Sequence, residues 1–248
     1  MVLGYLLAVF IGISLGLLGG GGSILTVPIL VYAMDMDPKL AIALSLAIVG
    51  TTSLIGVWRH KTAGNVAFKK AFVFAGSAML GTFLGAKASV FFTGEFQLGL
   101  FAVIMLLASF FMLRPVKMNE TGQKKDVQKW APLLISAFGV GILTGLVGVG
   151  GGFLIVPALV FLGGVNMKKA VGTSLLVISL NSFSGFAGYI SLLEIPWGFL
   201  LKFTSFSILG VVIGSYAVKF VSQEKLKVAF GVFLILMGAF IIYQNLGF

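Results

Sequence analysis

Two glycine-rich breaks in apolar surroundings are the features of this sequence that most clearly offer a chemical function. Gly19 to Gly22 and Gly148 to Gly152 each interrupt an apolar stretch, because glycine tolerates non-helical dihedral angles and weakens a helix by about 1 kcal/mol per residue. A helix that restarts after such a break exposes backbone N–H groups and a positive dipole end, which bind anions without a charged side chain. These breaks supply the candidate substrate-binding residues Gly20, Gly21, Gly22, Ser23, Thr26, Gly150, Gly151 and Gly152.

A second polar group follows each break on the next apolar segment. Ser45 and Thr52 are seven residues apart, two helical turns, and therefore share one helix face. Asn181 is the most informative member, because a carboxamide placed in hydrocarbon needs polar partners. The candidates from this group are Ser45, Thr52, Ser53, Thr173, Ser174, Asn181 and Ser182.

Both groups also have a purely structural interpretation. Glycines permit close helix packing in bilayers, and serine or threonine hydroxyls commonly bond between helices. Packing glycines prefer a spacing of four, which a run of four glycines does not have. The pairs Gly12/Gly16, Gly81/Gly85, Gly141/Gly145 and Gly210/Gly214 do have that spacing, and we assign them to helix contacts.

The elements that must position these residues occur twice. Residues 12–31 and 141–160 are identical at twelve of twenty positions without a gap, at an offset of 129. The same offset relates Lys39 to Lys168, Ser53 to Ser182 and Glu95 to Glu224. The pattern predicts two membrane repeats, 1–118 and 130–248, joined by a polar cytoplasmic linker at 119–129.

Composition places the chain in a bilayer. Hydrophobic residues make up 59% and charged residues only 10% of the 248 positions, against about a quarter charged in soluble domains. Strand-like alternation is absent, so helices are the expected spanning elements. We expect an all-α integral membrane protein with 8–10 membrane helices: in each repeat a broken hairpin (2–34; 131–163) and three spans, near 40–58, 71–92 and 98–114 and near 170–187, 203–218 and 228–245.

The basic residues predict how the halves are oriented. If each broken segment folds back as a hairpin, each half crosses the membrane an odd number of times and the halves are inverted. Fourteen of the seventeen Lys and Arg then lie on the cytoplasmic side, and only Lys39, Lys87 and Lys202 lie outside. The net charge of +10 is thus explained by orientation, with no nucleic-acid partner and both termini outside.

Inverted repeats with helices interrupted at matching positions are typical of secondary transporters. The glycine pattern at Gly141, Gly145, Gly148, Gly150, Gly151, Gly152 and Pro157, followed by Gly172-Thr173-Ser174-Leu175, resembles the TauE/SafE family, called sulfite exporters. The first half departs from this pattern at Ser23 and at Ala43-Leu44-Ser45-Leu46. The resemblance covers nearly the full chain and implies export of small sulfur-containing anions, such as sulfite or organosulfonates, across the inner (cell) membrane of a prokaryote.

Other functions fit the residues less well. An anion channel is the nearest alternative, since the same dipoles can line a pore; a structural subunit of a larger complex leaves the glycine breaks without a purpose. A membrane-embedded enzyme has little support, because there is no cysteine, one histidine, no evident nucleophile–base pair and no P-loop for ATP, so neither enzymatic activity nor a cofactor or metal is expected. All seven acidic residues fall in loops or at span ends, which disfavours an intramembrane proton relay. The partners expected are a small anionic substrate and the lipid bilayer, and the sequence sets no oligomeric state.

Overall fold

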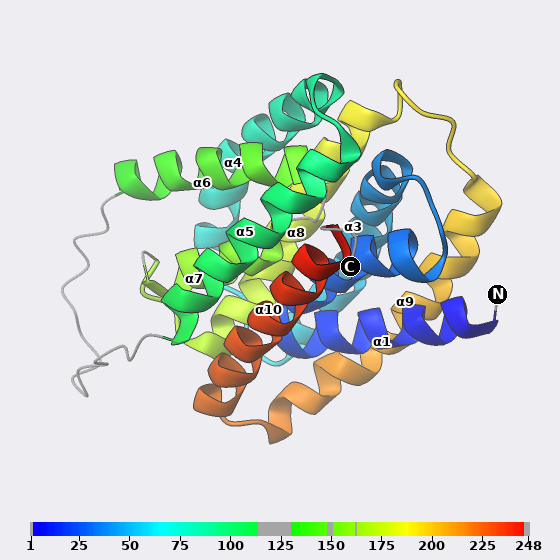
Figure 1. Ribbon diagram of the computed structural model, residues 1–248. Helices are drawn as coiled ribbons and strands as arrows, with labels where there is room; N and C mark the ends of the chain where they lie inside the picture. Colours follow the sequence, from blue (N-terminus) through cyan, green and yellow to red (C-terminus); the bar gives the residue numbers. More distant parts are fainter. Residues whose placement is uncertain (1, 114–129, 148–150, 162, 246–248) are drawn as a thin grey trace.

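The described part of the chain consists of helices joined by short loops. The computed structural model describes residues 2–113, 130–147, 151–161 and 163–245, and no strand occurs within these ranges. The first half contains α1 (Val2–Leu18), α2 (Gly21–Pro28), α3 (Pro38–Thr62), α4 (Phe68–Ala88) and α5 (Gly94–Leu113). The second half contains α6 (Trp130–Val147), α7 (Gly152–Phe161), α8 (Met167–Tyr189), α9 (Trp197–Ala217) and α10 (Gln223–Asn245) (Figure 1). Short turns, η1 (Ile29–Ala33), η2 (Ser89–Phe91) and η3 (Val218–Phe220), extend α2, α4 and α9.

The helices have the lengths and hydropathy of membrane spans. Among the described residues, α3, α4, α8, α9 and α10 are long and apolar enough to cross a bilayer, while α1, α5, α6 and the α2–η1 segment are shorter apolar helices. Many large apolar side chains on α4, α9 and α10 are exposed, as side chains facing lipid must be. The predicted all-α integral membrane fold is confirmed, and each predicted span contains a helix within the described residues. The predicted linker at 119–129 lies outside the described residues.

Local capping explains why the central helices begin earlier than predicted. The Asp37 carboxylate accepts hydrogen bonds from the backbone N–H groups of Lys39 and Leu40, and Pro38 occupies the first turn of α3. Asn166 caps α8 in the same way through the N–H of Lys169. Asp37 and Asn166 are themselves 129 residues apart, so both copies start this helix by one mechanism.

Both long apolar segments break at glycine, as predicted. α1 ends at Leu18, and Gly19 turns the chain with a φ of 70° before α2 begins at Gly21. α2 folds back onto α1. Gly22 of α2 lies so close to Ile11 and Leu15 of α1 that an added Cβ would overlap with them, and Gly4 of α1 faces Met34 near the far end of the segment. In the second half α6 ends at Val147, and Gly151 has a φ of 68° immediately before α7.

The duplication extends to the contacts between helices. α1 packs against α9, and its counterpart α6 packs in the same manner against α4, the counterpart of α9. Gly12 meets Gly210 and Gly81 lies against the backbone of Gly141, so close that a Cβ at any of these positions would overlap with the neighbouring backbone. The predicted role of these four-spaced glycines in helix contacts is confirmed. Each half therefore contributes one helix to a tight pair with the other half.

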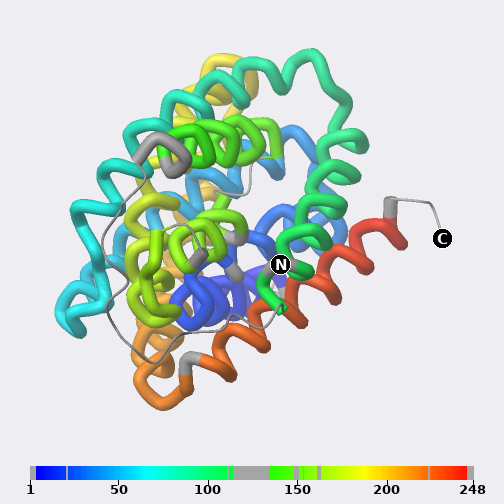
Figure 2. The backbone as a smooth tube through the Cα atoms, turned by 90° about the vertical axis from the view of Figure 1, so that its left-hand side faces the viewer, coloured from blue at the N-terminus to red at the C-terminus, as the bar shows by residue number. Residues whose placement is uncertain are grey.

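The helices α3 and α8 cross at the centre of the molecule. About 78% of the α3 span and 72% of the α8 span is buried, against 44% for α4 and α9 and 33% for α10. The two helices are antiparallel: Gly50 of α3 faces Ser182, and Gly56 faces Leu175. Their crossing point is marked by the Ser179 hydroxyl, which donates to the Gly50 carbonyl at 2.9 Å. Residues 50 and 179 are equivalent in the two copies. α5 and α10 are also antiparallel and lie along the outside (Figures 1 and 2).

Candidate substrate-binding site

The two glycine breaks meet in the interior. A Cβ at Gly152 would overlap with the Cα of Gly20, so the residue before α2 and the first residue of α7 are in direct backbone contact. Gly152 has no space for a side chain at this point, and no side chain caps the first turn of α2. The first N–H groups of a helix have no partner within the helix. The first N–H groups of α2 and those of α7 therefore lie on either side of the contact between Gly20 and Gly152.

One face of α8 lies against both breaks. A Cβ at Gly19 would meet Ser174, and a Cβ at Gly152 would meet Ile178, one turn further along α8. Asn181 follows at the next position on this face, since residues three or four apart lie on one side of a helix. Its counterpart on α3 is Thr52, and that of Ser174 is Ser45. On α8, Ser174 and Ile178 lie against the breaks, and helix periodicity puts Asn181 on the same side.

Asn181 is fully buried, and neither end of its carboxamide has a hydrogen-bond partner among the described residues. The hydroxyls of Ser53 and Ser182, which are equivalent in the two copies, are also buried without a partner. A buried polar group left without a hydrogen bond destabilises a protein by about 1–3 kcal/mol. These three side chains, grouped around the crossing of α3 and α8, therefore have unused capacity to bind a polar solute.

The remaining predicted hydroxyls bond to backbone carbonyls of their own segment. Ser23 donates to Gly20 at 2.7 Å, and Thr26 donates to Gly22 at 3.1 Å. Ser45 and Ser174 donate to the equivalent carbonyls of Ile42 and Val171, and Thr52 donates to Ile48. Each of these hydroxyls has committed its proton, so it offers an anion less than the buried groups whose donors are unused.

Two predicted residues stand apart from this cluster. Thr173 accepts a hydrogen bond from the backbone N–H of Ala67 at 2.9 Å, which ties the start of α8 to the loop between α3 and α4. Gly150 lies outside the described residues. The other predicted glycines, Gly20, Gly21, Gly22, Gly151 and Gly152, lie at or beside the contact between the breaks.

Sequence reasoning missed a pair of residues that hold the broken helices in place. The His60 ring nitrogen Nε2 lies 3.2 Å from the carbonyl of Gly16, in the last turn of α1. The Tyr189 hydroxyl donates to the carbonyl of Gly145, in the last turn of α6, at 3.1 Å. His60 and Tyr189 are equivalent in the two copies, as are Gly16 and Gly145, so the 129-residue offset was the signal that would have identified them. Both side chains are 2% exposed.

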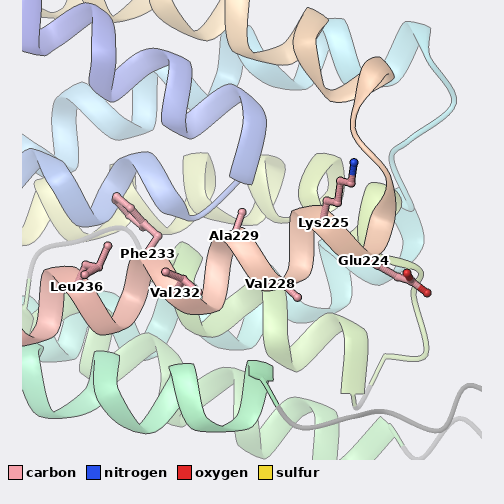
Figure 3. A pocket seen from close by; sticks show the side chains of 7 residues that line it. All are labelled: Glu224, Lys225, Val228, Ala229, Val232, Phe233 and Leu236. Atoms are coloured by element: carbon pink, nitrogen blue, oxygen red, sulfur yellow. The ribbon is translucent and has the colours of Figure 1, made fainter.

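A broad groove lies away from these residues. It has a volume of about 690 Å³, and α10 supplies all the residues that line it, from Glu224 and Lys225 at one end to Leu236 at the other (Figure 3). It opens broadly on the outer face of the molecule and contains none of the predicted site residues. Among the described residues, no group of three or more His, Cys, Asp or Glu side chains is arranged to hold a metal ion.

A bundle of apolar membrane helices with broken, polar-lined segments at its centre defines a membrane transport protein. Residues 4–241 match the family model described as "Sulfite exporter TauE/SafE", and the chain belongs to this family. The resemblance seen in the glycine motifs is thereby confirmed.

Relatives from several prokaryotes agree with this class. A "Probable membrane transporter protein" of Xylella fastidiosa is 31% identical over 95% of this chain and 92% of its own length. The "Probable membrane transporter protein YdhB" of Bacillus subtilis is 26% identical over 88% of this chain and 91% of its own. No solved structure matches the chain at comparable significance.

Proposed function

We propose that this protein is a secondary transporter that exports small, sulfur-containing anions such as sulfite or organosulfonates. The anion binds where the two glycine breaks meet, held by the first N–H groups of α2 and α7 and by the Asn181 carboxamide. It is released by alternating access, in which the site opens to one side of the membrane at a time. The repeats 1–118 and 130–248 then form two halves of one transport unit.

The observation that carries this proposal is the fully buried amide of Asn181, which has no partner among the described residues and follows Ser174 and Ile178, the two α8 residues that lie against the breaks. Asn181 can donate two hydrogen bonds, and a carboxamide kept in an apolar interior without a partner is otherwise unfavourable. Donors directed at one point in a low dielectric favour an anion, and no cationic side chain is required. The hydrogen-bond donors of such a site suit a small oxyanion.

An inverted arrangement of the halves is part of the proposal. The pairs formed by equivalent helices, α3 with α8 and α5 with α10, are each antiparallel. A two-fold axis perpendicular to membrane-crossing helices lies in the plane of the bilayer, which reverses one half relative to the other. The distribution of Lys and Arg supports the same orientation, with both termini outside the inner membrane.

Flux in liposomes tests the site. Asn181→Leu removes every donor of the carboxamide at similar volume, and we expect uptake of labelled sulfite to fall by about 10- to 100-fold, as loss of a hydrogen bond to a charged group implies. Lys87→Gln is the matched control, because Lys87 bonds to the Ser191 hydroxyl at an exposed position. A larger defect in Lys87→Gln than in Asn181→Leu would contradict the central site.

Two further measurements define the activity. Uptake against a counter-gradient separates a transporter from the anion channel, because a channel cannot concentrate its ion. Thermal unfolding of the purified protein with sulfite, sulfate, thiosulfate and sulfonates ranks substrates, since a bound ligand raises the unfolding temperature by mass action. Stabilisation by none of these anions would reject the proposed substrate class.

A further inference from the structure

We propose that a small cavity at the end of α8 is an outer subsite for the transported anion and that Tyr189 is the gate between this subsite and the second glycine break. The inference rests on the proposed function for the identity of the solute. The residues that line the cavity are Lys39, Ser89, Val90, Tyr189, Leu192 and Leu193.

The cavity has the size and charge of a small-anion site. Its volume is about 180 Å³, and a water molecule takes up about 30 Å³ in the liquid, so a hydrated oxyanion fits. Among the described residues that line it, Lys39 carries the only charge and none is a carboxylate. Partly enclosed by apolar walls, a single ammonium group attracts anions more strongly than it does in bulk water.

The helix ends around the cavity place it at one end of the bundle. Lys39 belongs to the first turn of α3, Ser89 follows α4, and Tyr189 ends α8. These ends lie together because α3 and α8 are antiparallel. Lys87 and Ser191 form a hydrogen bond of 2.9 Å at the same end, so a second lysine lies near the mouth. In the inverted arrangement this end faces outside.

Tyr189 connects the cavity to the glycine break. Its side chain lines the cavity, while its hydroxyl reaches the carbonyls of Gly145 at 3.1 Å and Leu146 at 3.4 Å. Those carbonyls belong to the last turn of α6, where helix carbonyls have no partner within the helix. The amide nitrogen of Gln97 also donates to Leu146 at 2.7 Å, and its Oε1 stays buried without a partner among the described residues.

An anion that enters the cavity competes with the Gly145 carbonyl for the Tyr189 proton. When the hydroxyl turns to the anion, the end of α6 loses one of the bonds that hold it, and the path toward the break can open. In the first half, His60 makes the equivalent bond to the Gly16 carbonyl at the end of α1. Both repeats therefore keep a side-chain bond to the end of the broken helix, although the residue that makes it differs.

Cysteine labelling of the full chain in nanodiscs tests the subsite without requiring transport. The chain contains no cysteine, so Leu192→Cys places a single thiol in the cavity. We expect an anionic methanethiosulfonate reagent to react about tenfold faster than a cationic one of similar size, because Lys39 raises the local anion concentration. Sulfate and methanesulfonate should protect the thiol; sulfite is unsuitable because it attacks the reagent.

Lys39→Gln in the same background should bring the two rates to near equality. Ser191→Cys is the matched control: its anion preference should depend on the neighbouring Lys87 and survive Lys39→Gln. A preference at Leu192→Cys that does not change with Lys39→Gln, or that neither anion protects, would overturn the subsite. These labelling rates can fail while the flux defect of Asn181→Leu stands, and the reverse also holds.

Labelling of a thiol beside the second glycine break tests the gate. Thr144→Cys places a thiol beside Gly151, where the native side chain is 2% exposed. Tyr189→Phe removes only the hydroxyl and should raise labelling of this thiol about fivefold, the effect of losing one hydrogen bond. Tyr189→His, which copies the first half, should restore slow labelling. Unchanged labelling in Tyr189→Phe would reject the gate, and unchanged labelling at Leu192→Cys serves as the control for folding.

Discussion

The two ends of the α3–α8 crossing are built from equivalent residues and yet differ. At the His60 end, the loop of residues 63–67 closes over the start of α8: Ala67 donates to Thr173, and a Cβ at Gly172 would overlap with the Asn65 carbonyl. At the Tyr189 end, the equivalent region contains a cavity. Duplication preserved the helix geometry, and a few substitutions then gave each end its own local packing.

The different packing at the two ends explains why the sequences of the two halves differ at particular positions. Gly172 and Thr173 correspond to Ala43 and Leu44, which have neither the room for a close carbonyl nor a hydroxyl to receive an N–H. The Gly-Thr-Ser-Leu motif in the second half therefore serves the contact with loop 63–67 as much as the site. Within this motif, Ser174 lies against a glycine break, at Gly19.

The largest effect is expected at the breaks. Gly151→Leu forces a left-handed residue to carry a side chain and drives that side chain into Thr144. We expect transport in liposomes to be abolished while membrane insertion, measured by yield after membrane extraction, is retained. The equivalent experiment in the first half is Gly21→Leu, for which we expect the same result.

Gly64→Leu separates backbone strain from crowding. Gly64 also has a φ of 70°, but a Cβ there meets nothing within 4 Å. Strain of this kind destabilises by about 1–3 kcal/mol, so a modest loss of thermal stability with measurable transport is expected. Equal loss of transport in Gly64→Leu and Gly151→Leu would mean that the contact between the breaks is not what matters.

The second effect concerns Thr52 and Asn181, which occupy equivalent positions in the two repeats but differ in residue type. Asn181→Thr makes α8 resemble α3 and replaces an orphan amide with a hydroxyl that can bond to its own helix, as Thr52 does. We expect labelled-sulfite transport to fall about tenfold and thermal stability to rise, because a buried unpaired group is removed. Thr52→Val should change transport less. A stronger defect in Thr52→Val would assign substrate contact to the first half.

The third effect tests the difference between the His60 end, which loop 63–67 covers, and the Tyr189 end, which contains the cavity. Gly172→Ala pushes a methyl group into the Asn65 carbonyl and the His60 side chain, and overpacking of this kind destabilises by about 1–3 kcal/mol. We expect a lower unfolding temperature and faster labelling of a cysteine introduced at Asn65. Ala43→Gly is the matched change in the other copy. Undisturbed labelling in Gly172→Ala would show that the loop is not held by this contact.

The smallest effect is expected at His60 itself. His60→Phe removes the bond to Gly16, and about 1 kcal/mol of stability should be lost. His60→Tyr copies Tyr189 and should recover most of that loss, as measured by thermal unfolding. If His60→Tyr is no better than His60→Phe, the two ends hold their broken helices by different means.

Much of the fold could be predicted because its causes are local and repeated. The spans follow from hydropathy, the breaks from runs of glycine, and the close pairs of helices from the four-residue spacing of Gly12/Gly16 and Gly81/Gly85. The helix starts at Pro38 and Met167 were missed by two to three residues, because capping by Asp37 and Asn166 extends each helix beyond its apolar part.

The site could be predicted only in part, since it depends on which segments meet. Ser45, Thr52, Ser174 and Asn181 share a face by helix periodicity, but no local pattern tells that Gly20 and Gly152 touch. His60 was not among the predicted site residues, because its burial depends on α1, forty-four residues away. Tyr189 was missed for the same reason. Such residues can be recognised by comparing equivalent positions of the two repeats, as His60 and Tyr189 show, even where helix periodicity gives no indication.

The close contact between Gly12 and Gly210, with its counterpart between Gly81 and Gly141, has a mechanical consequence. Backbones that touch without intervening side chains do not slide easily past each other, so α1 travels with α9 and α4 travels with α6. If the proposed alternating access moves whole helices, each moving body therefore contains helices from both repeats, and the boundary between the moving bodies does not coincide with the boundary between the repeats.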